Sequence, residues 1–151
     1  MNQRDDDLVT RLFSLWDDVP QGEAAVAAFR ELYADPVRIN GVDMTVEQLA
    51  ERAQRTAAAL EGRSTQVLSQ VSTGDRTAVA FRMTGRHVGP IDTPLGPVPA
   101  TGQVLVLDVI DVLLVTDGRI SEIFMTADYL GALGRAGAVE LTAGNHVAGT
   151  N

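Results

Sequence analysis

The sequence predicts an α+β fold in which helices pack on one face of a curved, mainly antiparallel sheet. Helical patterns fill the chain up to about Leu60, and strand patterns joined by turn signals follow. A last helical pattern, weakened by glycine, runs from Asp128 to about Gly137. The 151 residues are the usual size of one domain. We therefore expect a single domain over residues 1–138 and a flexible tail over residues 139–151, which show no periodicity.

Three helices are predicted in the N-terminal part of the chain. Residues 5–16 and 23–33 place apolar side chains at helical spacing, and the second segment stops before Pro36, because the residue preceding a proline disfavours helix. The PVRI segment that follows is expected to be a short strand. The third helix starts after Thr45, since Thr45 and Gln48 form a capping-box pattern ahead of an apolar stripe.

Strand patterns follow the third helix. The segments 67–71 and 77–87 flank one turn, and the segments 104–115 and 120–127 flank another. The strand 104–115 is apolar at both alternating positions, so both of its faces should be covered. Residues 85–102 hold four of the six prolines and four glycines, and we expect them to form a long loop that borders a pocket.

Composition and charge exclude several classes of function. The net charge is -8 and the arginines are scattered along the chain, so a nucleic-acid partner is not expected. The sequence has no cysteine and no lysine, which excludes thiol nucleophiles, cysteine zinc sites and lysine Schiff bases. No apolar run is long enough to cross a membrane and no secretory signal pattern opens the chain, so we expect a cytoplasmic protein.

A homodimer is also expected from the strand 104–115. Helices can cover only one of its two apolar faces, and an exposed apolar face of that size is unusual on a soluble monomer. We therefore expect the outer face of the sheet to pair with a second copy of the chain.

Four segments stand in a characteristic order in the second half of the chain: TGRHVGP, PATG, VLLVTDGRISEIF and ADYLGALGRAG. This order resembles the SnoaL-like polyketide cyclases of the nuclear-transport-factor-2-like superfamily, over residues 70–137. The resemblance implies a cone-shaped α+β barrel that encloses one apolar pocket. The activities it implies include cyclisation, isomerisation, dehydration, epoxide hydrolysis and noncatalytic binding.

The resemblance also implies site residues. The catalytic aspartate of the family matches Asp128, which also stands where a helix N-cap belongs, so a structural role is the alternative. His87, at a strand end, is the second catalytic candidate, and a structural histidine at the base of the loop is its alternative. Val112 and Leu114 match positions where the cyclases carry polar side chains, and Phe124 replaces a tryptophan.

Two carboxylates interrupt the apolar strand 104–115. Asp108 and Asp111 are three residues apart and therefore point to opposite faces, so one of them should face the pocket or its rim. Because burying an unpaired carboxylate is costly, we expect each to pair with an arginine such as Arg82 or Arg86. The residues expected to bind the substrate are Trp16, Tyr33, Phe81, Met83, Asp111, Val112, Leu114 and Phe124.

We expect a cofactor-free enzyme that acts on a hydrophobic polyketide-like or terpenoid-like molecule, with Asp128 as general base in a cyclisation or isomerisation. No HExxH, GxSxG, phosphate-loop or paired-histidine pattern occurs, so neither a metal nor a nucleotide cofactor is expected. One alternative is noncatalytic small-molecule binding, which apolar residues at 112 and 114 favour. Another is epoxide hydrolysis, which needs Asp111, Arg82 and Asp128 around one water.

Overall fold

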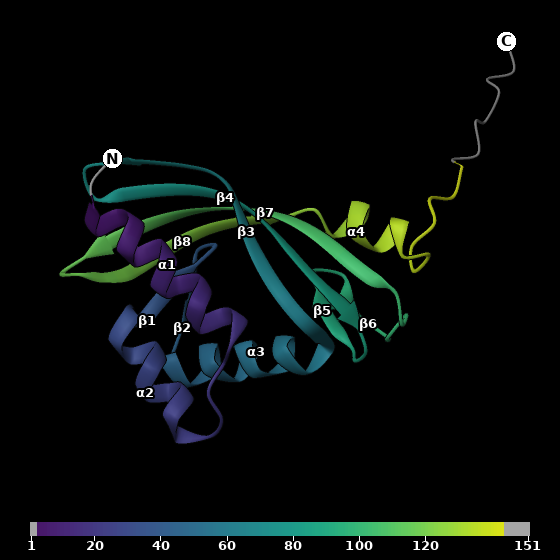
Figure 1. Ribbon diagram of the computed structural model, residues 1–151, viewed down its shortest axis with the longest axis horizontal. Coiled ribbons are helices and arrows are strands. Elements are labelled where there is room, and N and C mark those ends of the chain that lie inside the picture. Colours follow the sequence, from purple (N-terminus) through teal and green to yellow (C-terminus); the bar gives the residue numbers. More distant parts are fainter. Residues whose placement is uncertain (1–2, 144–151) are drawn as a thin grey trace, which may run out of the picture.

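A curved sheet with helices on one side forms the body of the molecule, and the computed structural model describes residues 3–143. The elements in chain order are α1 (Gln3–Asp17), α2 (Glu23–Leu32), β1 (Tyr33–Ile39), β2 (Val42–Met44), α3 (Val46–Ala59), β3 (Leu60–Thr73), β4 (Arg76–His87), β5 (Ile91–Thr93), β6 (Gly96–Val98), β7 (Val104–Thr116), β8 (Arg119–Ala127) and α4 (Tyr129–Arg135). Helices α1, α2 and α3 lie on the same side of the long strands, and α4 lies at the opposite end of the sheet from α1 and α2 (Figure 1).

The six strands of the main sheet follow the order β2-β1-β8-β7-β4-β3. Neighbouring strands are antiparallel except β1 and β8, which run parallel. The sheet curls over the helices without closing on itself (Figure 1). The predicted α+β class and mainly antiparallel sheet are therefore confirmed, with an open cone in place of a closed barrel.

Local signals place the helix boundaries near the site. The capping box at the start of α3 is present, because Thr45 Oγ1 accepts from the Gln48 N–H at 3.2 Å and Gln48 Oε1 accepts from the Thr45 N–H at 2.9 Å. Helix α2 ends at Leu32, and β1 starts at the next residue, Tyr33. Tyr33 is thus held at a helix-to-strand junction, where its side chain is buried.

The segment 85–102 differs from the predicted loop. Strand β4 continues through His87, and β5 and β6 form a two-stranded ribbon in the middle of the segment. Proline has no N–H group to donate, but each strand of a two-stranded ribbon has one edge that makes no hydrogen bonds to a neighbouring strand. A proline such as Pro97 in β6 is therefore tolerated there. The predicted turn before β8 is present, with Asp117 and Gly118 at φ of 51° and 77°.

Alternation along β7 separates its two faces. Leu105, Leu107, Val109, Asp111 and Leu113 are buried toward the helices, and the residues between them point to the outer face. The inner face of β7 therefore contributes apolar side chains to the core and one carboxylate, that of Asp111.

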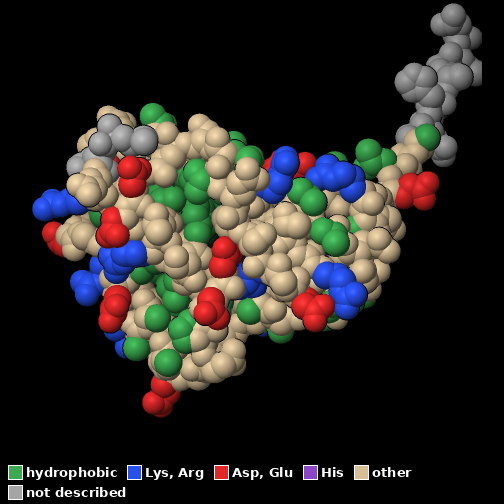
Figure 2. Space-filling view, viewed as in Figure 1, with side chains coloured by type: hydrophobic (Ala, Val, Ile, Leu, Met, Phe, Trp, Pro, Cys, Tyr) green, Lys and Arg blue, Asp and Glu red, His purple; other side chains and the backbone are tan. Residues whose placement is uncertain are grey.

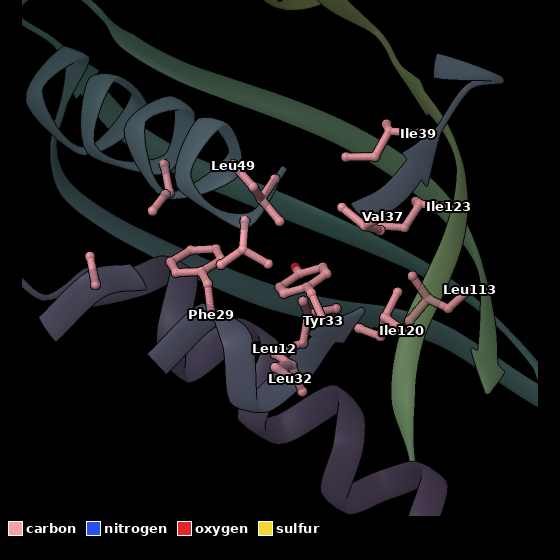
Figure 3. Packing of buried hydrophobic residues seen from close by; sticks show 14 of the residues in the cluster. Leu12, Phe29, Leu32, Tyr33, Val37, Ile39, Leu49, Leu113, Ile120 and Ile123 are labelled. Carbon is pink, nitrogen blue, oxygen red and sulfur yellow. The ribbon is translucent and has the colours of Figure 1, made fainter. Parts of the chain in front are cut away.

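The main core lies between the strands and the N-terminal helices. In Figure 3 Tyr33 lies in the middle of this cluster, with Phe29 on the helix side and Leu113 and Ile120 on the strand side. The rings of Phe29 and Tyr33 are stacked, with centroids 5.6 Å apart and planes 14° from parallel. This packing leaves the Tyr33 ring little freedom to move.

The outer face of the sheet carries an exposed apolar row. Val71, Ala78, Val112 and Phe124 are register neighbours on the adjacent strands β3, β4, β7 and β8. Val71 is 65% exposed, Phe124 is 52% exposed, and Ile110 beside the row is 55% exposed. The two ends of this row, and Ile110 beside it, are therefore uncovered by any part of residues 3–143.

Charged side chains are mixed over the rest of the surface. On the face drawn in Figure 2, acidic and basic side chains are interspersed and no continuous basic stripe is visible. Within the described part of the chain, no helix is long and apolar enough to cross a membrane.

The exposed apolar row predicts a homodimer through the outer face. Light scattering should give about twice the chain mass of 16.1 kDa. Phe124→Glu should shift the protein to the monomer mass, because a charge introduced into an apolar interface is desolvated without a partner. Arg11→Gln on the exposed face of α1 should leave the mass unchanged. A wild-type mass of one chain at micromolar concentration would contradict the prediction.

Candidate active site

A cavity of about 510 Å³ lies between the inner face of the sheet and the N-terminal helices. Its walls come from the helices α1, α3 and α4, from all six strands of the main sheet, and from the β5 end of the ribbon. Most of the lining is apolar, and the apolar residues include Leu12, Phe13, Phe81, Met83, Leu107, Val109 and Met125. The volume suits a small molecule, and the walls favour a hydrophobic one.

Asp111 is the carboxylate at the inner face of β7. Its side chain lines the cavity, the residue is only 8% exposed, and Oδ1 has no hydrogen-bond partner. Burial raises the pKa of Asp111 from 3.8 to about 7, although the positive charge of Arg52 opposes this shift. The carboxyl group therefore exchanges its proton near neutral pH, inside an apolar cavity.

Asp108 has the opposite environment. Its side chain points to the outer face, where Asp108 Oδ1 and Oδ2 accept from Arg82 at 2.7 and 3.0 Å. The hydrogen bond and charge of Arg82 hold the pKa of Asp108 below its ordinary value. The expected arginine partner is therefore present at Asp108, whereas Asp111 has no ion-pair partner within the described residues.

Tyr33 presents a hydroxyl to the same cavity. The indole Nε1 of Trp16 donates to the Tyr33 hydroxyl at 2.8 Å, so the phenol oxygen already acts as an acceptor there. Burial raises the pKa of Tyr33 above its ordinary value, so the hydroxyl keeps its proton. Within residues 3–143 that proton has no hydrogen-bond acceptor.

The end of α1 is tied to β3, and this fixes Trp16. The guanidinium of Arg63 donates to the carbonyl oxygen of Trp16. The carboxylate of Asp17 accepts from the Thr65 hydroxyl at 2.6 Å and from the Thr65 N–H at 3.1 Å. These contacts hold the indole of Trp16 against the cavity and orient its N–H toward Tyr33.

The structure brings together five of the predicted substrate-binding residues. Trp16, Tyr33, Phe81, Met83 and Asp111 all line the cavity. They come from different elements, α1, β1, β4 and β7, so only the tertiary structure places them side by side.

Val112, Leu114 and Phe124 lie on the other face of the sheet. Because successive strand residues alternate, Val112 and Leu114 point outward when Asp111 points inward. Phe124 is the register neighbour of Val112 and shares its face. The expected place of these three residues in the pocket is therefore corrected, and they belong to the exposed outer row or its margin.

Asp128 caps the helix α4. Its Oδ1 accepts from the Gly131 N–H at 2.8 Å, and the residue is exposed. Its chain neighbours Ala127 and Tyr129 line the cavity, but Asp128 is not among the lining residues. The three groups that epoxide hydrolysis would need are also apart, since Arg82 is engaged with Asp108 on the outer face.

His87 is fully buried at the end of β4 and is not among the residues that line the cavity. Its Nδ1 accepts from the Thr101 N–H at 3.3 Å and lies 3.1 Å from the Thr101 hydroxyl. The backbone beside it is also paired, because the His87 N–H donates to the Gln103 carbonyl at 2.8 Å. These contacts join the end of β4 to the chain that enters β7.

The cavity also contains polar residues that the sequence analysis missed. Arg52 of α3 lines the cavity together with Leu49 and Thr56, which lie on the same side of that helix. The sequence signal that could have identified Arg52 as a cavity residue is its position at the edge of the apolar stripe of α3. Arg55 and Asp92 join α3 to the ribbon through an ion pair of 3.2 Å at the rim. Among the described residues no cluster of His, Cys, Asp and Glu is arranged to hold a metal ion.

Comparison with family models matches residues 8–134 to the SnoaL-like polyketide cyclases. Comparison with curated proteins found no match.

Solved structures with the same fold include three informative relatives. TsrD from Streptomyces laurentii is 23% identical, with a TM-score of 0.76, covering 92% of this chain and 99% of that one. IdmH from Streptomyces antibioticus, described as a candidate polyketide cyclase, is 24% identical, with a TM-score of 0.69, covering 90% and 99%. A protein of ketosteroid isomerase-like fold from Catenulispora acidiphila is 17% identical, with a TM-score of 0.67, covering 91% and 98%. At these identities the likeness shows the fold alone.

We expect replacement of the buried Asp111 carboxyl group to stabilise the protein in a pH-dependent way. Because the pKa of Asp111 is raised to about 7 in the folded protein, folding weakens as pH rises from about 4 to about 7 and the group ionises. Each pKa unit is worth about 1.4 kcal/mol of unfolding free energy. The free energy of unfolding of Asp111→Asn minus that of wild type should therefore be larger at pH 8 than at pH 4, by up to roughly 4 kcal/mol. Urea denaturation at both pH values measures this difference. Equal differences at the two pH values would show that the carboxyl is not desolvated.

The buried histidine predicts a structural effect. His87→Ala should lower the free energy of unfolding by roughly 2–5 kcal/mol, because it empties a fully buried site and removes the acceptor of the Thr101 N–H. Urea denaturation measures the loss. Unchanged stability combined with lost activity would instead support a catalytic histidine.

Proposed function

Because the chain belongs to the SnoaL-like polyketide cyclase family, we propose that it is a cofactor-free enzyme that acts on a hydrophobic small molecule by general acid/base chemistry, with Asp111 as the base. Cyclisation and isomerisation both begin with the removal of a proton from carbon next to a carbonyl group. The proposal assigns that step to the carboxyl group inside the cavity.

The environment of Asp111 is the observation that carries the proposal. Its Oδ1 is buried without a partner in a cavity with mostly apolar walls. A general base is most effective when its pKa lies near the working pH, and burial brings the pKa of Asp111 to about 7. A carboxylate paired with an arginine, such as Asp108, is a weaker base because its pKa is lowered.

Tyr33 supplies the second group of the mechanism. When Asp111 takes the proton, the electrons of the C–H bond move toward the carbonyl oxygen and form an enolate. The Tyr33 hydroxyl, whose oxygen is already held by Trp16, donates its proton in a hydrogen bond to that oxygen. In a cyclisation the enolate then attacks a second carbonyl of the same molecule, which closes a ring, and the alkoxide so formed takes the proton back from Asp111. In an isomerisation the enolate takes that proton back at another carbon.

Deuterium exchange into a model ketone tests the base. The bicyclic ketone 2-tetralone is hydrophobic and exchanges its acidic protons in D₂O, which proton NMR follows. Wild-type protein should accelerate the exchange, with a rate that rises with pH up to about 7 and is then constant, because only the ionised carboxylate of Asp111 accepts the proton. Asp111→Asn should lower the accelerated rate by roughly two to four orders of magnitude.

Asp128→Asn is the matched control, since it makes the same chemical change at the residue that the family resemblance points to. Asparagine is a good N-cap, so the exchange rate should stay within about threefold of wild type and stability should change little. If Asp128→Asn lost the acceleration of deuterium exchange and Asp111→Asn kept it, the general base would be Asp128 and not Asp111.

Noncatalytic binding is the second candidate function, and the position of Asp128 favours it. If the aspartate of the family corresponds to Asp128, then this chain uses it as a helix cap outside the cavity. A binding protein would take up the ketone in the cavity without accelerating exchange in either variant or in wild type.

A further inference from the structure

Arg52 stands apart from the other arginines of the protein. Among residues 3–143, eight arginines contact a carboxylate or a backbone carbonyl, and they are Arg30, Arg38, Arg55, Arg63, Arg82, Arg86, Arg119 and Arg135. Arg4, Arg11 and Arg76 have no such contact but are exposed to solvent. Arg52 is the one that is partly buried and makes no side-chain hydrogen bond or ion pair within this range.

Arg52 is a charged residue of the cavity wall. The residue lines it from α3, and its positive charge acts on Asp111, Tyr33 and Tyr129, which line the same space. Arg52 and Asp111 face one cavity, yet no nitrogen of Arg52 lies within 4.0 Å of an Asp111 carboxylate oxygen, since they form no ion pair. Space therefore remains between the cation and the carboxyl group.

The other charges of the lining do not compensate Arg52. Arg55 and Asp92 neutralise each other at the rim through their ion pair of 3.2 Å. Asp111 is the one further acidic residue of the lining, and it forms no ion pair with Arg52. A guanidinium has five N–H donors, and those of Arg52 remain accessible and have no partner within residues 3–143, so they are free to donate to an acceptor that enters with a ligand.

We propose that the ligand of this cavity carries a carboxylate, which the guanidinium of Arg52 binds while the hydrocarbon part of the ligand fills the apolar space. A carboxylate matches the fork of a guanidinium through two parallel hydrogen bonds. A single negative charge suits a single uncompensated cation, whereas a phosphate ester would bring more charge than one arginine balances. This inference rests on the cavity being the ligand site of the proposed function, but not on Asp111 acting as a base.

In the proposed reaction this arrangement would orient the substrate. With the carboxylate on Arg52, the remainder of the ligand extends into the space bounded by Asp111 and the Tyr33 hydroxyl. Arg52 is then a specificity residue that selects carboxylic acids over their esters and amides.

A matched pair of ligands tests the inference through the tryptophan of the cavity. Trp16 is the single tryptophan of the sequence and lines the cavity, so its fluorescence reports binding there. Adamantane-1-carboxylate and its methyl ester share the same rigid hydrocarbon body and do not absorb where tryptophan does. Wild-type protein should bind the carboxylate roughly 10- to 100-fold more tightly than the ester, as expected for a charge-assisted hydrogen-bonded pair.

Arg52→Gln should reduce this ratio to nearly one, mainly by weakening the binding of the carboxylate. Arg11→Gln removes the same charge from the exposed face of α1 and should keep the ratio of wild type. Circular dichroism confirms that each variant is folded. Arg52→Lys, which keeps the charge and loses the fork, should give an intermediate ratio.

Three outcomes would overturn the inference. The first is that wild-type protein binds the acid and the ester with equal affinity. The second is that Arg52→Gln keeps the preference of wild type for the acid. Both would overturn the inference and leave the acid/base proposal intact. If neither compound binds by fluorescence or calorimetry, both the inference and the cavity as ligand site are contradicted. Conversely, a preference for the acid that depends on Arg52, in a protein that does not exchange ketone protons, would support a carboxylate-binding protein without catalysis.

Discussion

The register between β4, β7 and β8 decides which side chains reach the cavity. Asp108 and Asp111 lie on one strand and alternate to opposite faces, so one meets Arg82 in solvent and the other enters an apolar space. A shift of one residue would exchange the faces, because the side-chain period of a strand is two. It would bury Ile110 and Val112 and expose Asp111. The core and the chemistry of the site therefore depend on the same strand pairing.

The unpaired carboxyl group of Asp111 is unfavourable for stability, and the surrounding packing must offset it. Phe29 and Tyr33 stack in the main core, and the indole of Trp16 meets Phe29 edge-on with ring centroids 5.6 Å apart. Arg63 ties the end of α1 to β3 near this aromatic group. The same contacts that stabilise the fold also orient the hydroxyl of Tyr33, so the polar part of the cavity is held in place before any ligand binds.

Family membership and site chemistry give different information about this protein. Membership establishes the fold, which hosts several activities, so the reaction depends on the side chains in the cavity. Asp128 and Asp111 are both aspartates near the cavity, yet one satisfies the backbone of α4 and the other has no partner. The two residues are of the same type, and only their environments differ.

Local chemistry alone determined the boundaries of most elements. The capping box of Thr45 and Gln48 forms within one turn of helix. The alternation of inward and outward side chains along β7 follows from the order of consecutive residues. The sequence showed that Asp108 and Asp111 face opposite ways but not which one faces inward. Only the tertiary structure decided that, and only it brought Arg52 to the same cavity. A strand pattern defines two faces, but the face that becomes the interior is chosen by helices that pack on it from distant parts of the chain.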